Sequence, residues 1–318
     1  MQIRPSTPKD KHLPWYDHST LAAVSDCPRY GIITYRHNKH LYNAKKSDAL
    51  LGGNAAHKFF AAYDIYGLDK SISHAFTNEQ LEQFYTVAET AEDAGRRITF
   101  ALEAIYYHLD GLPDIESRKN AEKIEDSCLF WAEQQKHERI ILGVENKFSI
   151  TVDEKFRYVG LIDCLQLTKN GLLIPVERKT ASRIDDKYIA KWELSRQITG
   201  YHVALNTYQK AGLLSHKLAD YVEIEAQQFP ITRGDKTLRY IKQKYDREQW
   251  HYNEWYNWVI DNIRKTESNT PYDAPTREAC YNFNSICPLL KEFCSFDPKT
   301  REEIFNENMI TSVWDPTA

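Results

Sequence analysis

The chain has 318 residues, of which 42% are hydrophobic and 27% are charged, and its formal net charge is −4. This length allows one large domain or two ordinary ones, and no apolar run approaches the roughly 18 residues that a membrane span needs. Residues 1–16 lack the apolar core of a secretory signal, so we expect a cytoplasmic protein without membrane contact. Because the net charge is acidic, any contact with nucleic acid would depend on a local basic groove.

The N-terminal region is predicted to form a short helix after an extended lead-in. Residues 1–15 carry three prolines and several charges. Asp17-His18-Ser19 then precedes an apolar run, which is typical of a helix N-terminus capped by Asp or Ser. The segment 29–46 mixes basic residues with tyrosines. This mixture either follows a phosphate backbone and stacks bases, or is a solvated helix face beside core tyrosines.

A histidine marks the next predicted helix. Residues 52–63 follow a glycine turn, and His57 stands one helical turn after Gly53. A lone histidine on such a helix is more often a satisfied core residue than a ligand, but two acids later in the chain favour a role in metal binding. Residues 78–142 are rich in helix-forming residues and predict a helical insertion.

Two apolar runs between Tyr158 and Lys179 form the centre of the chain. They are joined by Lys169-Asn170-Gly171, and Asn-Gly between apolar runs is a strong signal for a β-hairpin. A further strand is predicted at 144–152, where Glu145 points either into a site or to the surface. The hairpin and this strand would form one sheet, which carries the candidate site.

The loop length of the hairpin decides which of its side chains meet. A two-residue loop would place Asp163 opposite Arg178. A three-residue loop with Gly171 in the left-handed conformation places Asp163 opposite Glu177, with Lys179 on the same face. Two facing acids seldom occur on a sheet without a cation between them. We therefore predict the three-residue loop.

This register predicts a metal site with a catalytic lysine. Asp163 and Glu177, together with His57, would hold Mg²⁺ or Mn²⁺, because oxygen-rich ligation suits these hard ions better than zinc. Lys179 would orient the attacking water or neutralise charge that builds up on the substrate.

The C-terminal half is predicted to contain further helices and one strand. Residues 185–214 predict a helix on which Gln197 and Tyr201, four residues apart, share a face. Residues 221–229 predict a strand. A helix should follow that strand and continue through the aromatic run 250–258. Basic residues recur at every third position of this helix and form a stripe: Arg233, Lys236, Arg239 and Lys242. The stripe is either a solvated surface or a track for phosphates.

The six cysteines are the last distinctive feature. In an intracellular protein they argue against a disulfide framework and for free thiols or metal ligation. Two of them precede proline, which suits the first turn of a helix and would place the thiolate at a helix N-terminus. A structural zinc site is possible, although zinc ligands more often come in closely spaced pairs. The candidate ligands lie at both ends of the chain: Cys27, Cys280, Cys287 and Cys294.

Together these motifs resemble the RecB-like branch of the PD-(D/E)XK nuclease superfamily. Gly160-x-x-Asp163 with Glu177-x-Lys179 resembles its active-site motif, the stretch 52–57 its upstream histidine motif, and the stretch 197–201 its QxxxY motif. The four cysteines resemble the iron–sulfur staple of AddB-type nucleases, exonuclease V and the CRISPR-adaptation nucleases, although the tail spacing is wider than in many relatives. The resemblance covers about residues 16 to 296.

The resemblance implies an α/β fold in which a small mixed sheet is flanked by helices. It implies a 4Fe-4S cluster that joins the two ends of the chain, and a metal-dependent DNA nuclease in which Gln197 and Tyr201 position the substrate. An exonuclease on single-stranded or end-containing DNA, in processing, repair or recombination in a bacterial or phage-infected cell, fits best. The expected parts of one composite domain are 1–56 with the first cysteine, 57–142 with the histidine helix and insertion, 143–268 as nuclease core, and 269–318 as cysteine-rich segment.

Other functions use the same features. A structure- or sequence-specific endonuclease would need the same site, and a non-catalytic iron–sulfur DNA-binding module would keep the fold and the cluster. A redox-responsive protein would use the cluster as its functional centre. The intact set of His57, Asp163, Glu177 and Lys179 argues against a non-catalytic module. The sequence contains no P-loop of the G-x4-G-K-[ST] type, so unwinding of DNA would need a partner such as a helicase or another recombination protein.

Overall fold

The computed structural model describes ten stretches of the chain, and all structural statements concern them: 2–41, 48–71, 96, 98–99, 101–105, 115–135, 139–228, 238–272, 274 and 287–311. The chain divides into two compact units. Unit 1 comprises residues 1–45, 149–160 and 249–318, and unit 2 comprises residues 46–148 and 161–248. None of the helices in these stretches is long and apolar enough to cross a bilayer.

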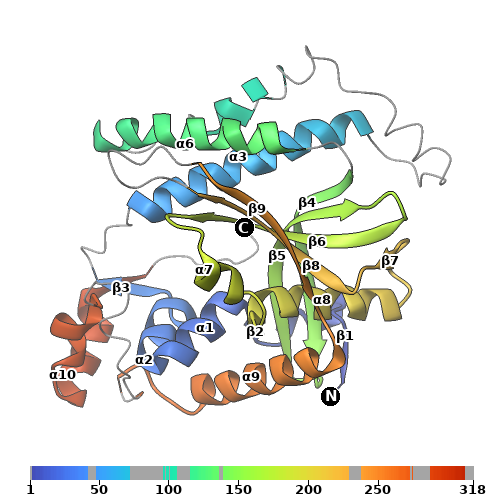
Figure 1. The fold of residues 1–318 in the computed structure, drawn as a ribbon. Coiled ribbons are helices and arrows are strands. Elements are labelled where there is room, and N and C mark those ends of the chain that lie inside the picture. The colour runs from blue at the N-terminus through green and yellow to red at the C-terminus, as the bar shows by residue number, and fades with distance from the viewer. Residues whose placement is uncertain are drawn as a thin grey trace. The chain divides into compact units, whose positions relative to one another are not determined.

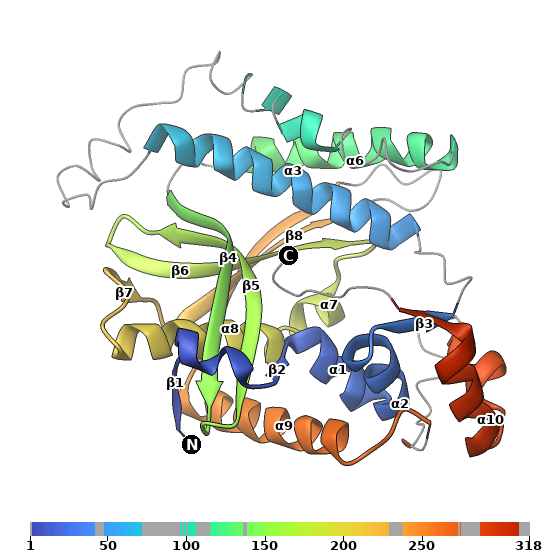
Figure 2. The same ribbon diagram turned by 180° about the vertical axis from the view of Figure 1, so that it is seen from behind.

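Unit 1 draws its elements from both ends of the chain. Helix α1 (His18–Asp26) packs against helix α9 (Gln249–Glu267), which is drawn in orange in Figures 1 and 2. Two short strands, β3 (Lys39–Leu41) and β10 (Met309–Thr311), pair antiparallel. The remaining elements are β1 (Ile3–Pro5), a 3-10 helix (Pro8–His12), β2 (Trp15–Tyr16), α2 (Pro28–Gly31), α10 (Pro298–Glu303) and three π-helical turns (Ile32–Arg36, Leu290–Cys294 and Ile304–Asn308).

The predicted start of the first helix is confirmed. The carboxylate of Asp17 accepts hydrogen bonds from the backbone N–H groups of Ser19 and Thr20 at 3.1 and 3.2 Å, which satisfies two donors that a helix N-terminus leaves unpaired. Helix α2 begins with Pro28 at its first position, as expected for the Cys27-Pro28 pair. Gly31 ends this helix in close contact with Val24 of α1.

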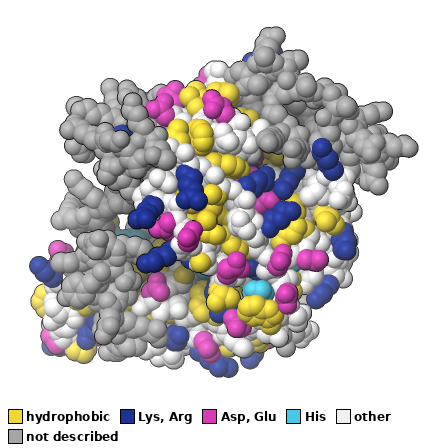
Figure 3. Space-filling model, viewed as in Figure 1, with side chains coloured by type: hydrophobic (Ala, Val, Ile, Leu, Met, Phe, Trp, Pro, Cys, Tyr) yellow, Lys and Arg dark blue, Asp and Glu magenta, His cyan; other side chains and the backbone are white. Residues whose placement is uncertain are grey.

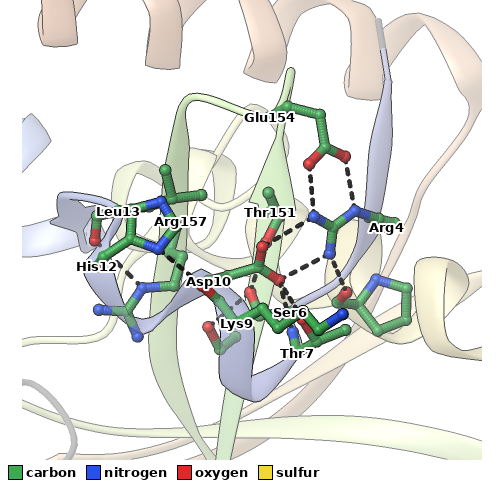
Figure 4. A network of polar contacts seen from close by, with 12 residues as sticks. Arg4, Ser6, Thr7, Lys9, Asp10, His12, Leu13, Thr151, Glu154 and Arg157 are labelled. Carbon is green, nitrogen blue, oxygen red and sulfur yellow. Dashed lines mark hydrogen bonds and ion pairs between the residues drawn. The ribbon is translucent and has the colours of Figure 1, made fainter.

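The N-terminal segment is more ordered than the expected extended lead-in. Strand β1 pairs antiparallel with the end of strand β4 (Ile140–Val152). The guanidinium of Arg4 donates to both oxygens of Asp10, at 2.7 and 2.8 Å, and also to Glu154 (Figure 4). These hydrogen bonds, with one from the Thr7 backbone, lower the pKa of Asp10 below its usual range. Charged residues of the expected extended lead-in therefore fix the segment in place.

Unit 2 contains a mixed but mostly antiparallel sheet. Strand β5 (Phe156–Leu167) is antiparallel to β6 (Leu172–Ala181), and β8 (Tyr221–Gln228) is antiparallel to β9 (Tyr240–Asp246). Strand β6 pairs in parallel with β8 and with the short β7 (Lys217–Leu218). Strands β4 and β5, which are neighbours in the strand order, each contribute residues to both units.

Helices pack on the sheet of unit 2. Helix α3 (Asp48–Ser71) lies along α6 (Ile115–Gln134), as both ribbon views show (Figures 1 and 2). Their interface is aromatic, because Phe59, Phe60 and Tyr63 of α3 surround the buried ring of Trp131. Helix α8 (Arg196–Lys210) contacts β6 and β8. The predicted α/β class, with a mixed sheet flanked by helices, is confirmed at this level.

The predicted hairpin register is confirmed. The ladder between β5 and β6 pairs Cys164 with Val176 and Leu167 with Leu173, and the next pair in this series is Asp163 and Glu177. The loop closes with a hydrogen bond from the Thr168 N–H to the Leu172 carbonyl at 2.9 Å. Gly171 has a φ of 73°, the left-handed conformation that the three-residue loop requires.

Candidate active site

Strand β6 presents successive residues to different layers of unit 2. Glu177 and Lys179 share one face, where the Lys179 ammonium contacts Oε1 of Glu177. Arg178 lies between them in sequence and turns to the other face, where its guanidinium lies over the ring of Trp131. This alternation follows from the period of two along a strand. It separates the candidate site from a buried network behind it.

Helix α8 contributes the two residues of the predicted Q-x-x-x-Y pair. Nε2 of Gln197 donates to Oε1 of Glu177 and to the hydroxyl oxygen of Tyr201, each at 2.8 Å. The spacing of four residues places both side chains on one helical face, as the sequence predicted. The helix therefore brings Gln197 to Glu177, and Tyr201 to Gln197.

Helix α3 brings His57 to the acid of the neighbouring strand. Nδ1 of His57 lies 3.7 Å from Oδ2 of Asp163. Burial, with the nearby charge of Lys179, lowers the pKa of His57 to about 4, so the imidazole is neutral at pH 7. A Cβ at Gly53 would lie 3.3 Å from the hydroxyl of Thr180, so the helix passes close to β6 one turn before His57.

The two acids and the lysine perturb each other strongly. Burial and the charge of Asp163 raise the pKa of Glu177 to about 7. Burial also raises the pKa of Asp163. Burial opposes the charged form of Lys179, but the carboxylates of Glu177 and Asp163 outweigh it and raise the pKa of the amine. Strongly perturbed carboxyl groups beside a fixed cation are typical of functional sites.

The side chains of the site differ in their exposure. The side chains of His57 and Lys179 keep 28% and 26% of their surface exposed, and that of Asp163 keeps 18%. Glu177 itself is only 1% exposed, and its Oε2 has no hydrogen-bond partner among the described residues. An unsatisfied buried carboxylate oxygen is costly unless a ligand or water satisfies it.

The sequence left open whether Glu145 points into the site or to the surface, and in the structure its charge acts on an acid of the site. Its charge adds to the effect of burial in raising the pKa of Asp163, so its carboxylate lies within electrostatic reach of the acids. Its backbone φ of 51° is uncommon for a glutamate in a strand.

A buried ionic network lies behind the site, and the sequence did not reveal it. The Arg178 guanidinium is 2% exposed, pairs with Asp64 of α3, and contacts Glu225 of β8 at 3.2 Å. It also donates to the Phe60 carbonyl at 3.4 Å. The available signal was Asp64 itself, because it stands two helical turns after His57 on the same side of α3.

The basic helix expected after the strand predicted at 221–229 does not form at residues 240–246, whereas the aromatic run 250–258 is helical, as predicted, within α9. Residues 240–246 are strand β9, in which Lys242 contacts Glu223 at 3.1 Å and Glu225 at 3.0 Å. Lys242 therefore neutralises buried acids of β8. Arg233 and Lys236 lie outside the described residues, and Arg239 donates to the Ile184 carbonyl. On the face shown in Figure 3, basic and acidic side chains are interspersed.

The expected Mg²⁺ or Mn²⁺ site is not supported. His57, Asp163 and Glu177 are all described, yet no group of three or more His, Cys, Asp or Glu side chains in the described stretches is arranged to hold a metal ion. Their atoms are directed at protein donors instead of a common point. Oε1 of Glu177 faces Lys179 and Gln197, and Oδ2 of Asp163 accepts the backbone N–H of Arg178 at 2.8 Å.

The expected 4Fe-4S cluster is not supported either. Cys27, Cys287 and Cys294 are described and form no metal-holding group with any other described residue; Cys280 lies outside the described residues. Cys27 is buried at the start of α2, whereas Cys287 and Cys294 pack against a cluster that contains Ile33, Phe293 and Phe305. Cys287 and Cys294 therefore take part in apolar packing. Cys128 and Cys164 are fully buried.

Comparisons with known proteins do not identify a family. No protein-family model matches the chain, and no curated protein matches it. A solved structure described as "Crystal structure of SSO0001" is similar over 58% of this chain and 82% of its own, with 14% sequence identity and a TM-score of 0.29. A similarity this weak carries no argument about fold or function.

Proposed function

We propose that the protein is a nuclease with a PD-(D/E)XK core of the RecB-like branch, which hydrolyses phosphodiester bonds in DNA. It would act as an exonuclease on single-stranded or end-containing DNA in processing, repair or recombination, with a helicase or similar partner where a duplex must be opened. The observation that carries the proposal is the gathering of Asp163, Glu177 and Lys179 on one face of the β5–β6 hairpin. Carboxylates beside a fixed ammonium suit the attack of water on an anionic ester.

Glu177 is suited to accept a proton from the attacking water. Its pKa of about 7 means that the carboxyl group is partly ionised at neutral pH, which is the range in which a general base works best. Gln197 and Lys179 hold its Oε1. Its Oε2, which has no partner in the described part of the chain, is the oxygen available to a water molecule.

Lys179 is suited to stabilise the transition state. Its ammonium is held charged by the two carboxylates and keeps part of its surface exposed. A fixed cation at this position would stabilise the negative charge that builds on the phosphate oxygens during attack. Gln197 and Tyr201 would orient the Glu177 carboxylate, and neutral His57 would support Asp163.

The test is cleavage of labelled DNA by the full chain. Linear single-stranded DNA, linear duplex and covalently closed circles are incubated in EDTA, Mg²⁺ and Mn²⁺, so that the same assay reads any requirement for a divalent ion. We expect linear DNA to be degraded from its ends. Lys179→Ala should lower turnover by about 10² or more, the scale expected for one lost charge stabiliser. Lys169→Ala, at the exposed tip of the same hairpin, is the control.

Each result has a defined meaning. Cleavage of closed circles would identify an endonuclease that uses the same site. DNA binding without cleavage in any condition would identify a non-catalytic binding module. Intact DNA together with no DNA binding would refute the proposal, and so would full activity of both Lys179→Ala and Glu177→Ala.

A further inference from the structure

A second lysine lies next to Lys179 on the segment that follows β6. Helix α7 (Asp186–Ala190) and the turn after it carry Tyr188, Lys191 and Trp192. Nζ of Lys191 lies 3.9 Å from the centre of the Tyr188 ring and 4.7 Å from that of the Trp192 ring. Nζ of Lys179 lies 5.9 Å from the same Trp192 ring. One indole ring is therefore within cation–π reach of both ammonium groups.

Lys191 differs from Lys179 in its partners. Lys179 contacts Glu177, whereas no carboxylate oxygen of the described residues forms an ion pair with Lys191 within 4.0 Å. Partial burial and the charge of Lys179 lower the pKa of Lys191. The ammonium groups of Lys179 and Lys191 lie near the same Trp192 ring, and only that of Lys179 is neutralised by a carboxylate. The remaining positive charge favours binding of an anion. Lys191 is exposed, so an anion can approach it from solvent.

The segment that carries this lysine is firmly anchored. The Arg247 guanidinium donates to the Trp192 carbonyl at 2.9 Å, and the Tyr245 hydroxyl donates to the Ile189 carbonyl at 3.0 Å. The Asp185 carboxylate accepts the Tyr188 N–H at 2.9 Å and so caps α7. These contacts from β9 and from Arg247, which follows it, hold the backbone of the segment in place before any ligand arrives, which lowers the entropic cost of binding.

We propose that Lys191, supported by Tyr188 and Trp192, binds the backbone phosphate next to the one that is cleaved. The inference rests on the proposed nuclease function and adds a substrate subsite to it. The rings position the Lys191 ammonium by cation–π contacts, and the ammonium forms a charge-assisted contact with a phosphate oxygen. Lys179 serves the reacting phosphate, and Lys191 sets the register of the strand.

The experiment compares DNA binding and turnover in matched variants of the full chain. Binding of a fluorescein-labelled single-stranded oligothymidylate is followed by anisotropy over a range of NaCl concentrations. For Lys191→Ala, the slope of log affinity against log salt should fall by about 0.7, the value for one phosphate contact to a single strand. Its main kinetic effect should be a higher KM, and Lys191→Arg should restore both values. Lys187→Ala, exposed on the same helix, is the control and should match the wild type.

The outcomes separate this subsite from the proposed function. If the wild type binds and cleaves DNA but Lys191→Ala keeps the full salt slope, the subsite is wrong and the nuclease proposal stands. If Lys187→Ala loses as much slope as Lys191→Ala, the effect is general surface charge and the subsite is also wrong. If the wild type neither binds nor cleaves DNA, both proposals fall.

Discussion

The backbone N–H of Arg178 donates to Oδ2 of Asp163 at 2.8 Å, while the Arg178 guanidinium is buried on the other face of the sheet. This residue therefore serves two purposes. Its main chain holds an acid of the candidate site, and its side chain joins β6 to α3 through the pair with Asp64. Lys179, the next residue, faces the site.

The first prediction concerns the contribution of the Arg178 side chain to stability. Arg178→Ala removes the guanidinium that pairs with buried Asp64 and leaves Glu225 with Lys242 as its cation. Loss of one partner from a buried pair costs about 3–5 kcal/mol. Urea unfolding should show this loss. Arg183→Ala is the control, because its contact with Asp185 is largely exposed and should be worth at most about 1 kcal/mol. An Arg178→Ala protein as stable as the wild type would contradict the network.

A second prediction concerns the pH dependence of stability at Glu177. Its pKa is raised from 4.5 to about 7, so the folded protein binds this proton more tightly than the unfolded chain does. The resulting stability is fully present below pH 4.5 and is lost as the pH rises through 7. The difference is worth roughly 3 kcal/mol. Glu177→Gln, which cannot ionise, should therefore be more stable than the wild type at pH 8.

The measurement is a series of urea melts between pH 4.5 and pH 8. The advantage of Glu177→Gln should shrink as the pH falls and vanish near pH 4.5. Glu193→Gln, at an exposed position, serves as the surface control. Parallel stability curves for the wild type and Glu177→Gln would show that burial of this carboxyl group is not costly.

A third prediction concerns Lys242 of β9. Its ammonium neutralises Glu223 and Glu225, so Lys242→Ala should lower the free energy of unfolding. The loss should be smaller than for Arg178→Ala, because a third of the lysine side chain is exposed and solvent screens the remaining charge. The salt dependence of DNA binding should not change. If Lys242→Ala reduced the slope of log affinity against log salt, Lys242 would instead be a contact for a DNA phosphate.

A fourth prediction concerns the packing of α1 on α2. A Cβ at Gly31 would lie 2.4 Å from the backbone nitrogen of Val24, so Gly31→Ala forces two backbones apart. Overpacking of this kind costs about 1–3 kcal/mol, which thermal melting would detect. Gly143→Ala is the matched control, since its Cβ would meet only the movable end of the Asn146 side chain. Equal stability of the two variants would show that Gly31 and Val24 do not approach each other this closely.

Local patterns predicted the parts of the candidate site that depend on local geometry. Asn170-Gly171 fixes a loop length, and the loop length fixes which strand residues face each other. The pairing of Asp163 with Glu177 therefore followed from a few neighbouring residues. The contact between Gln197 and Tyr201 depended only on helical spacing.

Features that depend on distant partners could not be predicted in this way. The spacing of Arg239 and Lys242 fits a helix, but these residues follow strand β8, whose buried acids hold Lys242 in a neighbouring strand. Tertiary contacts of this kind override local propensity. The single helix expected over 185–214 divides into α7 and α8, because Trp192 is buried in the turn between them and its carbonyl binds Arg247.

Spacing also failed to predict the surroundings of the cysteines. Residues such as Cys27 and Cys294 stand far apart in the chain, and their spacing carries no information about where each sulfur points. In the structure Cys27 is buried at the start of α2, and Cys294 packs against an apolar cluster of unit 1. The same limit applies to metal ligation by His57, because a ligand set needs converging atoms as well as suitable residue types.

The interleaving of the two units affects how the chain can fold during its synthesis. Unit 1 needs residues 1–45 as well as residues 249–318, whereas the last residue of unit 2 is 248. Helix α1 therefore leaves the ribosome early but must wait for α9 before its apolar side is covered. Since domains fold as units while the chain emerges, unit 2 should fold first. A ribosome stalled before α9 would then hold a folded unit 2 and an exposed α1, which is a state that chaperones would recognise.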